Sequence, residues 1–114
     1  MNTRKYSKKQ EAQVAKALGG KRQPNSGATP FMKGDVVSKH FCIECKTATT
    51  EKASFSIKRE WLDKLQEECF AIGKPFWALA FNFGGLGNKQ NFYIINEQLF
   101  KQLQEHLRKE LEDV

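Results

Sequence analysis

The twelve residues from 35 to 46 constrain the fold most, because they hold two short β-rich runs separated by one polar pair. Residues 35–38 and 41–46 are predicted to pair as an antiparallel hairpin. Side chains alternate across a strand, which gives the second run two faces: Cys42, Glu44 and Lys46 on one, and Phe41, Ile43 and Cys45 on the other. The pairing would place Asp35, at the start of the first run, close to Glu44 and Lys46 at the end of the second.

The chemistry of this hairpin end depends on two carboxylates and one ammonium. Converging hard oxygens suit Mg²⁺, which usually takes one or two carboxylates together with waters and phosphate oxygens. Lys46 would supply a positive charge, or a proton-transfer group, beside a reacting phosphate. The alternative is a solvated sheet face, because opposite charges two positions apart on a strand are common there and a lone Glu-x-Lys carries little information.

A third acid, Glu11, lies on a predicted helix over residues 8–18. Ser7 and Gln10 match a capping box at its start, and two glycines follow its end. Glu11 falls on the apolar stripe of this helix with Val14, and burial of an unpaired carboxylate is costly. A metal or a lysine beneath the carboxylate would remove that cost. The alternative is a first-turn glutamate that faces water and favours the helix dipole.

Residues 19–32 are rich in Gly, Pro, Asn, Ser and basic residues, and this composition predicts a mobile loop. Lys21, Arg22, Asn25 and Ser26 could meet a phosphate there through side chains and exposed backbone amides. The alternative is a solvated connector without a ligand.

Hydrophobic periodicity and turn residues predict the remaining elements. They are a helix at 58–72 with room for a short strand at 55–57 before it, a strand at 76–81 covered on both faces, a strand at 91–95 and a last helix at 97–112. The last helix carries a stripe made of Leu99, Leu103, Leu107 and Leu111, with Phe100 alongside. This stripe could cover the sheet or form a dimer seam.

The 114 residues suffice for a single domain with one modest core, preceded by a flexible basic lead-in at residues 1–6. A formal charge of +6 is expected of a protein that meets polyanions, although ribosomal and membrane-surface proteins carry the same excess. No signal peptide and no apolar run of membrane-spanning length is present, so we expect a cytoplasmic protein without a membrane partner.

The three cysteines are an odd number, which argues against a disulfide framework and for a reducing compartment. Cys42 and Cys45 have the spacing of half a zinc site. They should point to opposite faces of a strand, however, and no second pair of ligands follows at a suitable spacing. Buried thiols are therefore the favoured interpretation.

The order of these elements and acids resembles the PD-(D/E)xK nuclease superfamily, and within it the archaeal-type Holliday-junction resolvases and their phage relatives. The matching segments are Glu11, Arg22 through Ser26-Gly27, Gly34-Asp35-Val36, Ile43 to Thr47, and the Trp61-Leu62 helix before an apolar strand. The likeness covers roughly residues 7 to 82, and Gly34 stands where the superfamily name has proline. It implies an α/β fold with a restriction-endonuclease-like αβββαβ core, in which helices flank a mixed central sheet, here with an extra C-terminal strand and helix.

The resemblance also implies a site and a function. Mg²⁺, which Mn²⁺ could replace, would be held by Glu11, Asp35, Glu44 and the backbone carbonyl of Cys45. Lys46 would orient or activate the attacking water, and Ser26 would sit near the scissile phosphate. The implied DNA contacts are Lys21, Arg22, Asn25, Ser26, Lys33 and Lys58. Resolvases of this kind act as homodimers on four-way DNA junctions, here in a bacterial host or a phage-infected cell.

Two alternatives stay open at this point. The first is another nuclease of the same fold, such as a nicking, repair or phage DNA-processing enzyme, because a fold does not specify its substrate. The second is a non-catalytic nucleic-acid-binding module that uses the basic surface alone.

Overall fold

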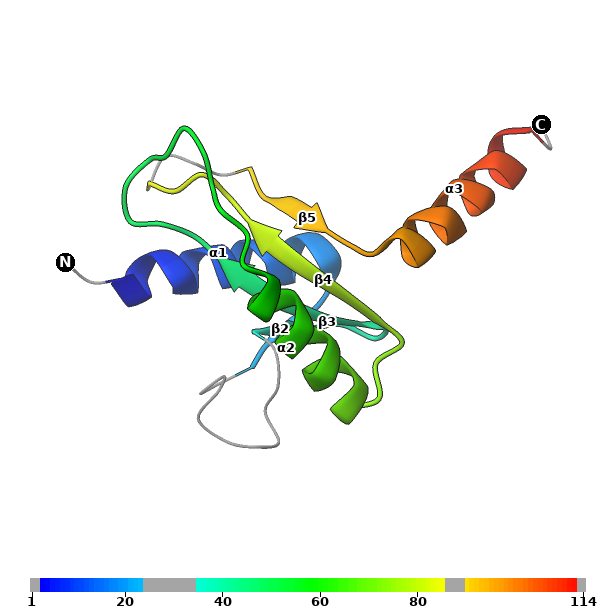
Figure 1. Cartoon of the computed structure of the whole chain (residues 1–114), viewed down its shortest axis with the longest axis horizontal. Coiled ribbons are helices and arrows are strands. Elements are labelled where there is room, and N and C mark those ends of the chain that lie inside the picture. The colour runs from blue at the N-terminus through cyan, green and yellow to red at the C-terminus, as the bar shows by residue number, and fades with distance from the viewer. Residues whose placement is uncertain (1–2, 24–34, 86–89, 113–114) are drawn as a thin grey trace.

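Residues 3–23, 35–85 and 90–112 are described by a computed structural model, and they form a five-stranded sheet with three helices (Figure 1). The elements in chain order are α1 (Thr3–Leu18), β1 (Lys21–Arg22), β2 (Val36–Val37), β3 (Phe41–Lys46), α2 (Arg59–Ala71), β4 (Phe76–Phe81), β5 (Phe92–Ile94) and α3 (Glu97–Glu112). The predicted α/β class with a mixed sheet is confirmed.

The strands cross the sheet in chain order, β1-β2-β3-β4-β5. Neighbouring strands are antiparallel except for β3 and β4, which run parallel. A parallel pair needs a long crossover connection, and α2 provides it. In the β2–β3 hairpin, Val36 lies opposite Ile43 and Val37 lies opposite Cys42, so the predicted antiparallel hairpin is confirmed.

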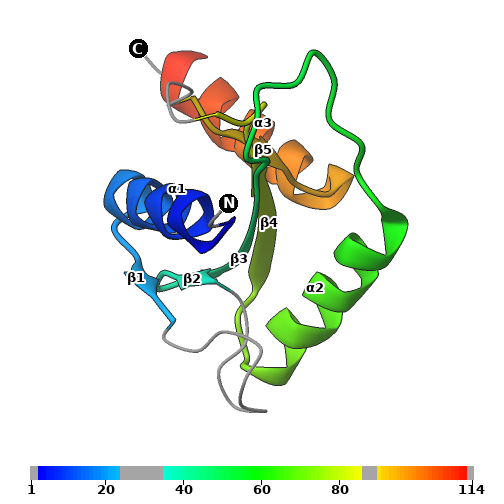
Figure 2. The ribbon, with the colours of Figure 1, turned by 90° about the vertical axis from the view of Figure 1, so that its left-hand side faces the viewer.

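Helices α1 and α2 cover opposite faces of the sheet, as Figure 2 shows from the end. The α1-side core consists of Val14, Val36, Ile43, Ala78 and Ala80, and the α2-side core of Cys42, Leu65, Cys69 and Leu79. Consecutive residues of β3 thus enter different cores, which confirms the predicted alternation. Cys45 packs against the α1-side core while Cys42 belongs to the other, so these two thiols point to opposite faces as expected.

The end of α2 shows why its boundary was predictable from sequence. Gly73 has φ +72°, the left-handed conformation that glycine adopts without strain. Its amide donates to the carbonyl of Phe70, and the amide of Lys74 donates to that of Cys69. These two bonds satisfy carbonyls that the helix leaves open, in a Schellman motif.

Three local predictions were wrong. Helix α1 begins at Thr3, so residues 3–6 are helical and not a flexible lead-in. Nothing in residues 3–7 stops a helix, and each added residue gains a backbone hydrogen bond once a helix exists, so the weak capping signal at Ser7 did not decide the boundary. Residues 55–57 form no strand, and the predicted loop at 19–32 contains the short strand β1 before its later residues leave the described part of the chain.

Helix α3 has the predicted bounds, but it extends away from the sheet (Figure 1). Leu99 is buried, whereas Phe100, Leu103, Leu107 and Leu111 are 45–74% exposed. Its stripe therefore does not cover the sheet of this chain. None of the helices among the described residues is long and apolar enough to cross a membrane.

Candidate active site

The β2–β3 hairpin positions Asp35. The register places it opposite Glu44, one step beyond the Val36–Ile43 pair. Its amide donates to the Ile43 carbonyl at 2.9 Å, and its carboxylate Oδ2 accepts from the Cys45 amide at 2.8 Å. Asp35 is 9% exposed. Backbone and side chain are both held, so the predicted approach of Asp35 to the end of β3 is present in the structure.

Glu44 and Lys46 project from the same face of β3, toward α2. The Lys46 Nζ lies 3.6 Å from Glu44 Oε1, and the side chains are 29% and 24% exposed. The same ammonium lies 4.5 Å from the ring centre of Trp61 on α2, a cation–π contact. These three residues, with Glu60, Lys64, Leu65 and Glu68, line a cavity of about 430 Å³. Glu44 and Lys46 therefore open into a space large enough for a ligand group.

Glu11 approaches from the other side of the sheet, on α1. Its side chain is 15% exposed, and its Oε1 lies 3.5 Å from Nε of Arg22 on β1. This supports the expectation of a partly buried acid, and it identifies arginine as the cation beside it. Helix α1 contacts β1, β2 and β3. The packing of α1 against these strands therefore positions the Glu11 carboxylate, whereas the β2–β3 hairpin positions Asp35 and Glu44.

The pKa values of Glu11 and Glu44 are both raised above the ordinary value of a glutamate. Burial first, and the Asp35 charge second, raise the pKa of Glu44 to about 7 against the lowering effect of Lys46. Burial also raises the pKa of Glu11, again with the help of Asp35, while Arg22 lowers it. The charge of Asp35 raises the pKa of both glutamates, so Asp35 interacts electrostatically with each of them. The three acids outnumber the two cations that form ion pairs with them, Arg22 and Lys46.

A divalent cation fits this donor set on chemical grounds. Carboxylate oxygens are the ligands that Mg²⁺ prefers. A dication beside these acids would offset the burial and the Asp35 charge that raise the pKa of both glutamates. Across residues 3–23, 35–85 and 90–112, no three His, Cys, Asp or Glu side chains lie close enough together to hold one ion. Instead, Glu11 forms an ion pair with Arg22, and Glu44 forms one with Lys46. Of Cys45, it is the amide that the structure links to the site.

The predicted DNA contacts fall in separate places. Lys21 and Arg22 are exposed on β1, beside Glu11. Lys58 is exposed on the other side of the sheet, where its Nζ lies 5.7 Å from the Trp61 ring centre. Asn25, Ser26 and Lys33 lie outside the described residues. The cations that the structure does place therefore flank the acids from both faces.

Sequence reasoning missed Gln10, the neighbour of Glu11. It is 1% exposed, and its Nε2 donates to the carbonyls of Lys46 at 2.8 Å and Ala80 at 3.3 Å and to Oδ1 of Asn91 at 3.2 Å. The capping-box interpretation of Gln10 was wrong. The available signal was its spacing of four from Val14, which places both on the buried face. Through its bond to the Lys46 carbonyl, Gln10 links α1 to the end of β3. It does so directly beside Glu11, one of the proposed metal ligands.

The amide network continues through Asn82, which is 4% exposed. Its Oδ1 accepts from the Thr47 hydroxyl at 2.5 Å and from the Gly84 amide at 2.9 Å, and its Nδ2 donates to Asn91. A Cβ at Gly84, whose φ is +92°, would collide with the Thr50 carbonyl. The chain after Lys46 is therefore held by side-chain amides where the strand hydrogen bonds end.

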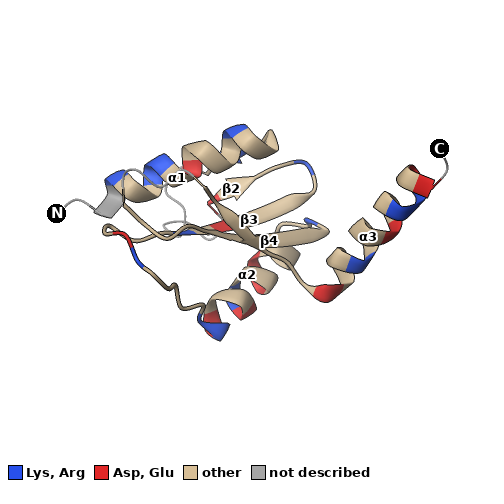
Figure 3. Ribbon diagram, turned by 90° about the horizontal axis from the view of Figure 1, so that it is seen from above, with Lys and Arg blue, Asp and Glu red and all other residues tan. Residues whose placement is uncertain are grey.

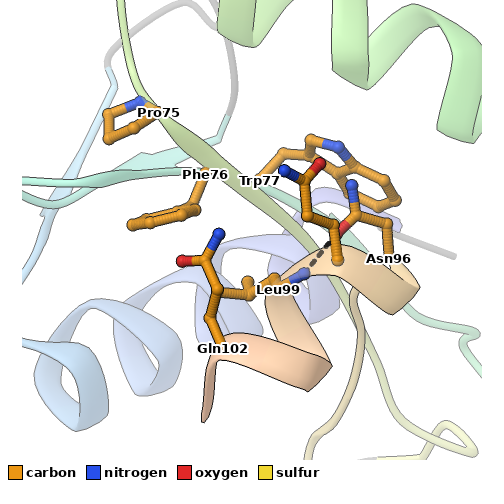
Figure 4. A pocket seen from close by; sticks show the side chains of 7 residues that line it. Pro75, Phe76, Trp77, Asn96, Leu99 and Gln102 are labelled. Atoms are coloured by element: carbon orange, nitrogen blue, oxygen red, sulfur yellow. Dashed lines mark hydrogen bonds between the residues drawn. The ribbon is translucent and has the colours of Figure 1, made fainter. Parts of the chain in front are cut away.

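A second cavity, of about 160 Å³, lies between the start of β4 and the start of α3 (Figure 4). It is lined by Pro75, Phe76, Trp77, Asn96, Gln98, Leu99 and Gln102. Its polar groups are amides, and Asn96 uses its Oδ1 to cap α3 through the Leu99 amide at 2.9 Å. No acid or base lines this cavity, so it offers no catalytic group.

Comparisons of the chain with models of known families, with curated proteins and with solved structures found no match.

Proposed function

We propose that this chain is a metal-dependent DNA endonuclease of the PD-(D/E)xK type, and that its substrate is a four-way DNA junction. The observation that carries the proposal is the meeting of Asp35 with the Glu44–Lys46 pair at one end of the β2–β3 hairpin. The strand order supports it, since α1, three antiparallel strands, α2 and a strand parallel to β3 reproduce the αβββαβ order expected of this superfamily.

Each residue has a role in this proposal. Glu11, Asp35 and Glu44 would hold Mg²⁺, or Mn²⁺ in its place, which when bound supplies a water of lowered pKa and neutralises charge on the phosphoryl oxygens. Lys46 holds a positive charge in the lining of the cavity, where a phosphate oxygen or the attacking water would lie. Lys21, Arg22 and Lys58 would contact the DNA backbone without reading its sequence.

The proposal includes a homodimer. Resolution of a four-way junction requires two paired incisions, and the described part of each chain contributes one such site. The exposed stripe Phe100, Leu103, Leu107 and Leu111 does not cover the sheet, which leaves the dimer seam as the alternative that we retain for α3.

The test is cleavage of an end-labelled four-way junction in Mg²⁺, with the matching linear duplexes in parallel reactions. Paired, symmetric incisions in the junction alone are expected. Cleavage of the linear duplexes as well would keep the nuclease and exclude junction selectivity. Binding without cleavage in either metal would favour a non-catalytic module.

The residue assignment has its own test. Glu44→Gln keeps the shape of the side chain and removes its charge, so cleavage should fall by at least about a hundredfold while DNA binding in EDTA stays unchanged. Glu60→Gln is the matched control, because Glu60 is an exposed acid that lines the same cavity. Equal activity of both variants would refute the role of Glu44.

A further inference from the structure

The two helices that cover the sheet differ in charge. Helix α1 carries five Lys or Arg residues and one Glu, a formal charge of +4, while α2 carries four acids and two bases, a formal charge of −2. Figure 3 shows the basic residues spread along α1 and both signs on α2. Since α1 and α2 lie on opposite faces of the sheet, the basic helix covers one face and the acidic helix covers the other.

Three lysines form a row on the outward side of α1. Lys5, Lys9 and Lys16 are exposed, and helical periodicity places them opposite the buried pair Gln10 and Val14. With a rise of about 1.5 Å per residue, the row spans roughly 16 Å along the helix axis. We call these three residues the α1 lysine row.

The α1 lysine row leads toward the candidate active site. Lys8 is exposed, and its charge helps to lower the pKa of Glu11 against the rise caused by burial. Lys21 and Arg22 follow on β1, which packs against α1, and Arg22 contacts Glu11. A positive surface therefore runs from the outward side of α1 to the first of the proposed metal ligands.

Within α1 itself, the spacing of this row brings no stabilisation. Lys5 and Lys9 lie four residues apart, where like charges repel and destabilise an isolated helix. The one acid of α1, Glu11, contacts Arg22 on β1. The usual interpretation of such a row is a solvated face, but the row is confined to one of the two covering helices and is continuous with the site.

We infer that the outward side of α1 is a binding surface for the phosphate backbone of double-stranded DNA, with the α1 lysine row as its contacts. This inference rests on the proposed function, because it extends the same substrate away from the reacting phosphate. Lysine ammonium groups act as point charges on phosphates and read no base sequence.

The test compares two triple variants that remove equal charge. The α1 variant is Lys5→Gln, Lys9→Gln and Lys16→Gln; the control is Arg59→Gln, Lys101→Gln and Lys109→Gln, whose side chains are exposed on α2 and α3. Binding of a fluorescent linear duplex would be measured by anisotropy in EDTA over a salt series. Thermal melts of both variants would establish that each is folded.

The α1 variant should bind at least tenfold more weakly than the control, and its plot of log affinity against log salt should be shallower by about 2 to 3, because each lost phosphate contact removes about 0.9. Equal losses in both variants would mean that only net charge matters, and would overturn the inference. So would a wild-type protein that binds no duplex, or an α1 variant that loses binding to anionic lipid vesicles but not to DNA.

The outcomes separate the two proposals. If the α1 variant alone loses duplex binding and the wild-type protein cleaves no DNA in Mg²⁺ or Mn²⁺, the surface stands and the nuclease proposal fails. If the wild-type protein cleaves DNA and both variants bind equally, the nuclease stands and the surface is refuted.

Discussion

Glu44 should destabilise the metal-free protein at neutral and higher pH, and Glu44→Gln should remove that cost. The pKa of Glu44 is raised from its ordinary 4.5 to about 7, first by burial and then by Asp35. An acid with a higher pKa in the folded state holds its proton more tightly there. Wild-type stability should therefore fall as the pH rises from about 4.5 to about 7, and stay low above that.

The size of the effect follows from the same values. A pKa raised from 4.5 to about 7 corresponds, at about 1.4 kcal/mol per pH unit, to roughly 3 kcal/mol. This value already includes the opposing effect of Lys46, because the pKa of about 7 is the net result of burial and all neighbouring charges. We expect Glu44→Gln to be more stable than the wild type by about 3 kcal/mol near pH 8, and equally stable near pH 4.

The assay is urea or thermal unfolding followed by circular dichroism in EDTA, at both pH values. A gain of about 3 kcal/mol corresponds to a rise in Tm on the order of 12 °C for a domain of this size. Glu60→Gln, an exposed acid at the same cavity, is the control. A variant that is less stable than the wild type near pH 8, or whose advantage is the same at both pH values, would refute the raised pKa of Glu44.

Metal addition extends this experiment. Mg²⁺ at one hundred times its Kd should stabilise the wild type by about 2.7 kcal/mol, and Glu44→Gln by clearly less. A wild-type protein whose stability does not respond to Mg²⁺ or Mn²⁺ would contradict the metal site without any reference to catalysis.

The other predictions follow from single contacts. Trp61→Leu removes the aromatic face under the Lys46 ammonium and should lower kcat for cleavage about threefold to thirtyfold with little change in KM, whereas Trp61→Phe should recover part of the loss; an unchanged kcat would refute the contact. Gln10→Leu removes the amide that donates to the Lys46 and Ala80 carbonyls and should cost about 2 kcal/mol in urea unfolding; a neutral variant would refute that contribution. Leu107→Glu should turn a dimer into a monomer in sedimentation velocity at unchanged Tm, and an unchanged sedimentation coefficient would exclude that seam.

Several elements were predictable because their signals are local. The alternation at residues 41–46, the apolar run at 76–81, the glycine after α2 and the asparagine before α3 each act within a few residues. The two strands of the hairpin are separated by one short turn, so their pairing, and with it the approach of Asp35 to Glu44, could be expected from sequence.

The parts that were missed depend on contacts between distant segments. Gln10 looks like a capping residue when only its neighbours are considered, yet its partners are 36, 70 and 81 residues away. The same holds for Trp61, whose contact with Lys46 exists only because α2 packs on β3. Residues 3–6 became helical although a plausible start signal followed them, since capping preferences are weak beside helix propagation.

The amino-acid sequence by itself determined which residues share a strand face. It also determined where α2 ends and where α3 begins, and it made the chain basic. Tertiary structure brought Glu11 close enough to Asp35 for the charge of Asp35 to raise its pKa, and it formed the cation–π contact between Lys46 and Trp61. It also placed the basic and acidic helices on opposite faces of the sheet. The physical reason is distance. Propensity and periodicity act over one or two turns, whereas burial, charge crowding and cation–π contact arise only after packing removes water between segments that are far apart in the chain.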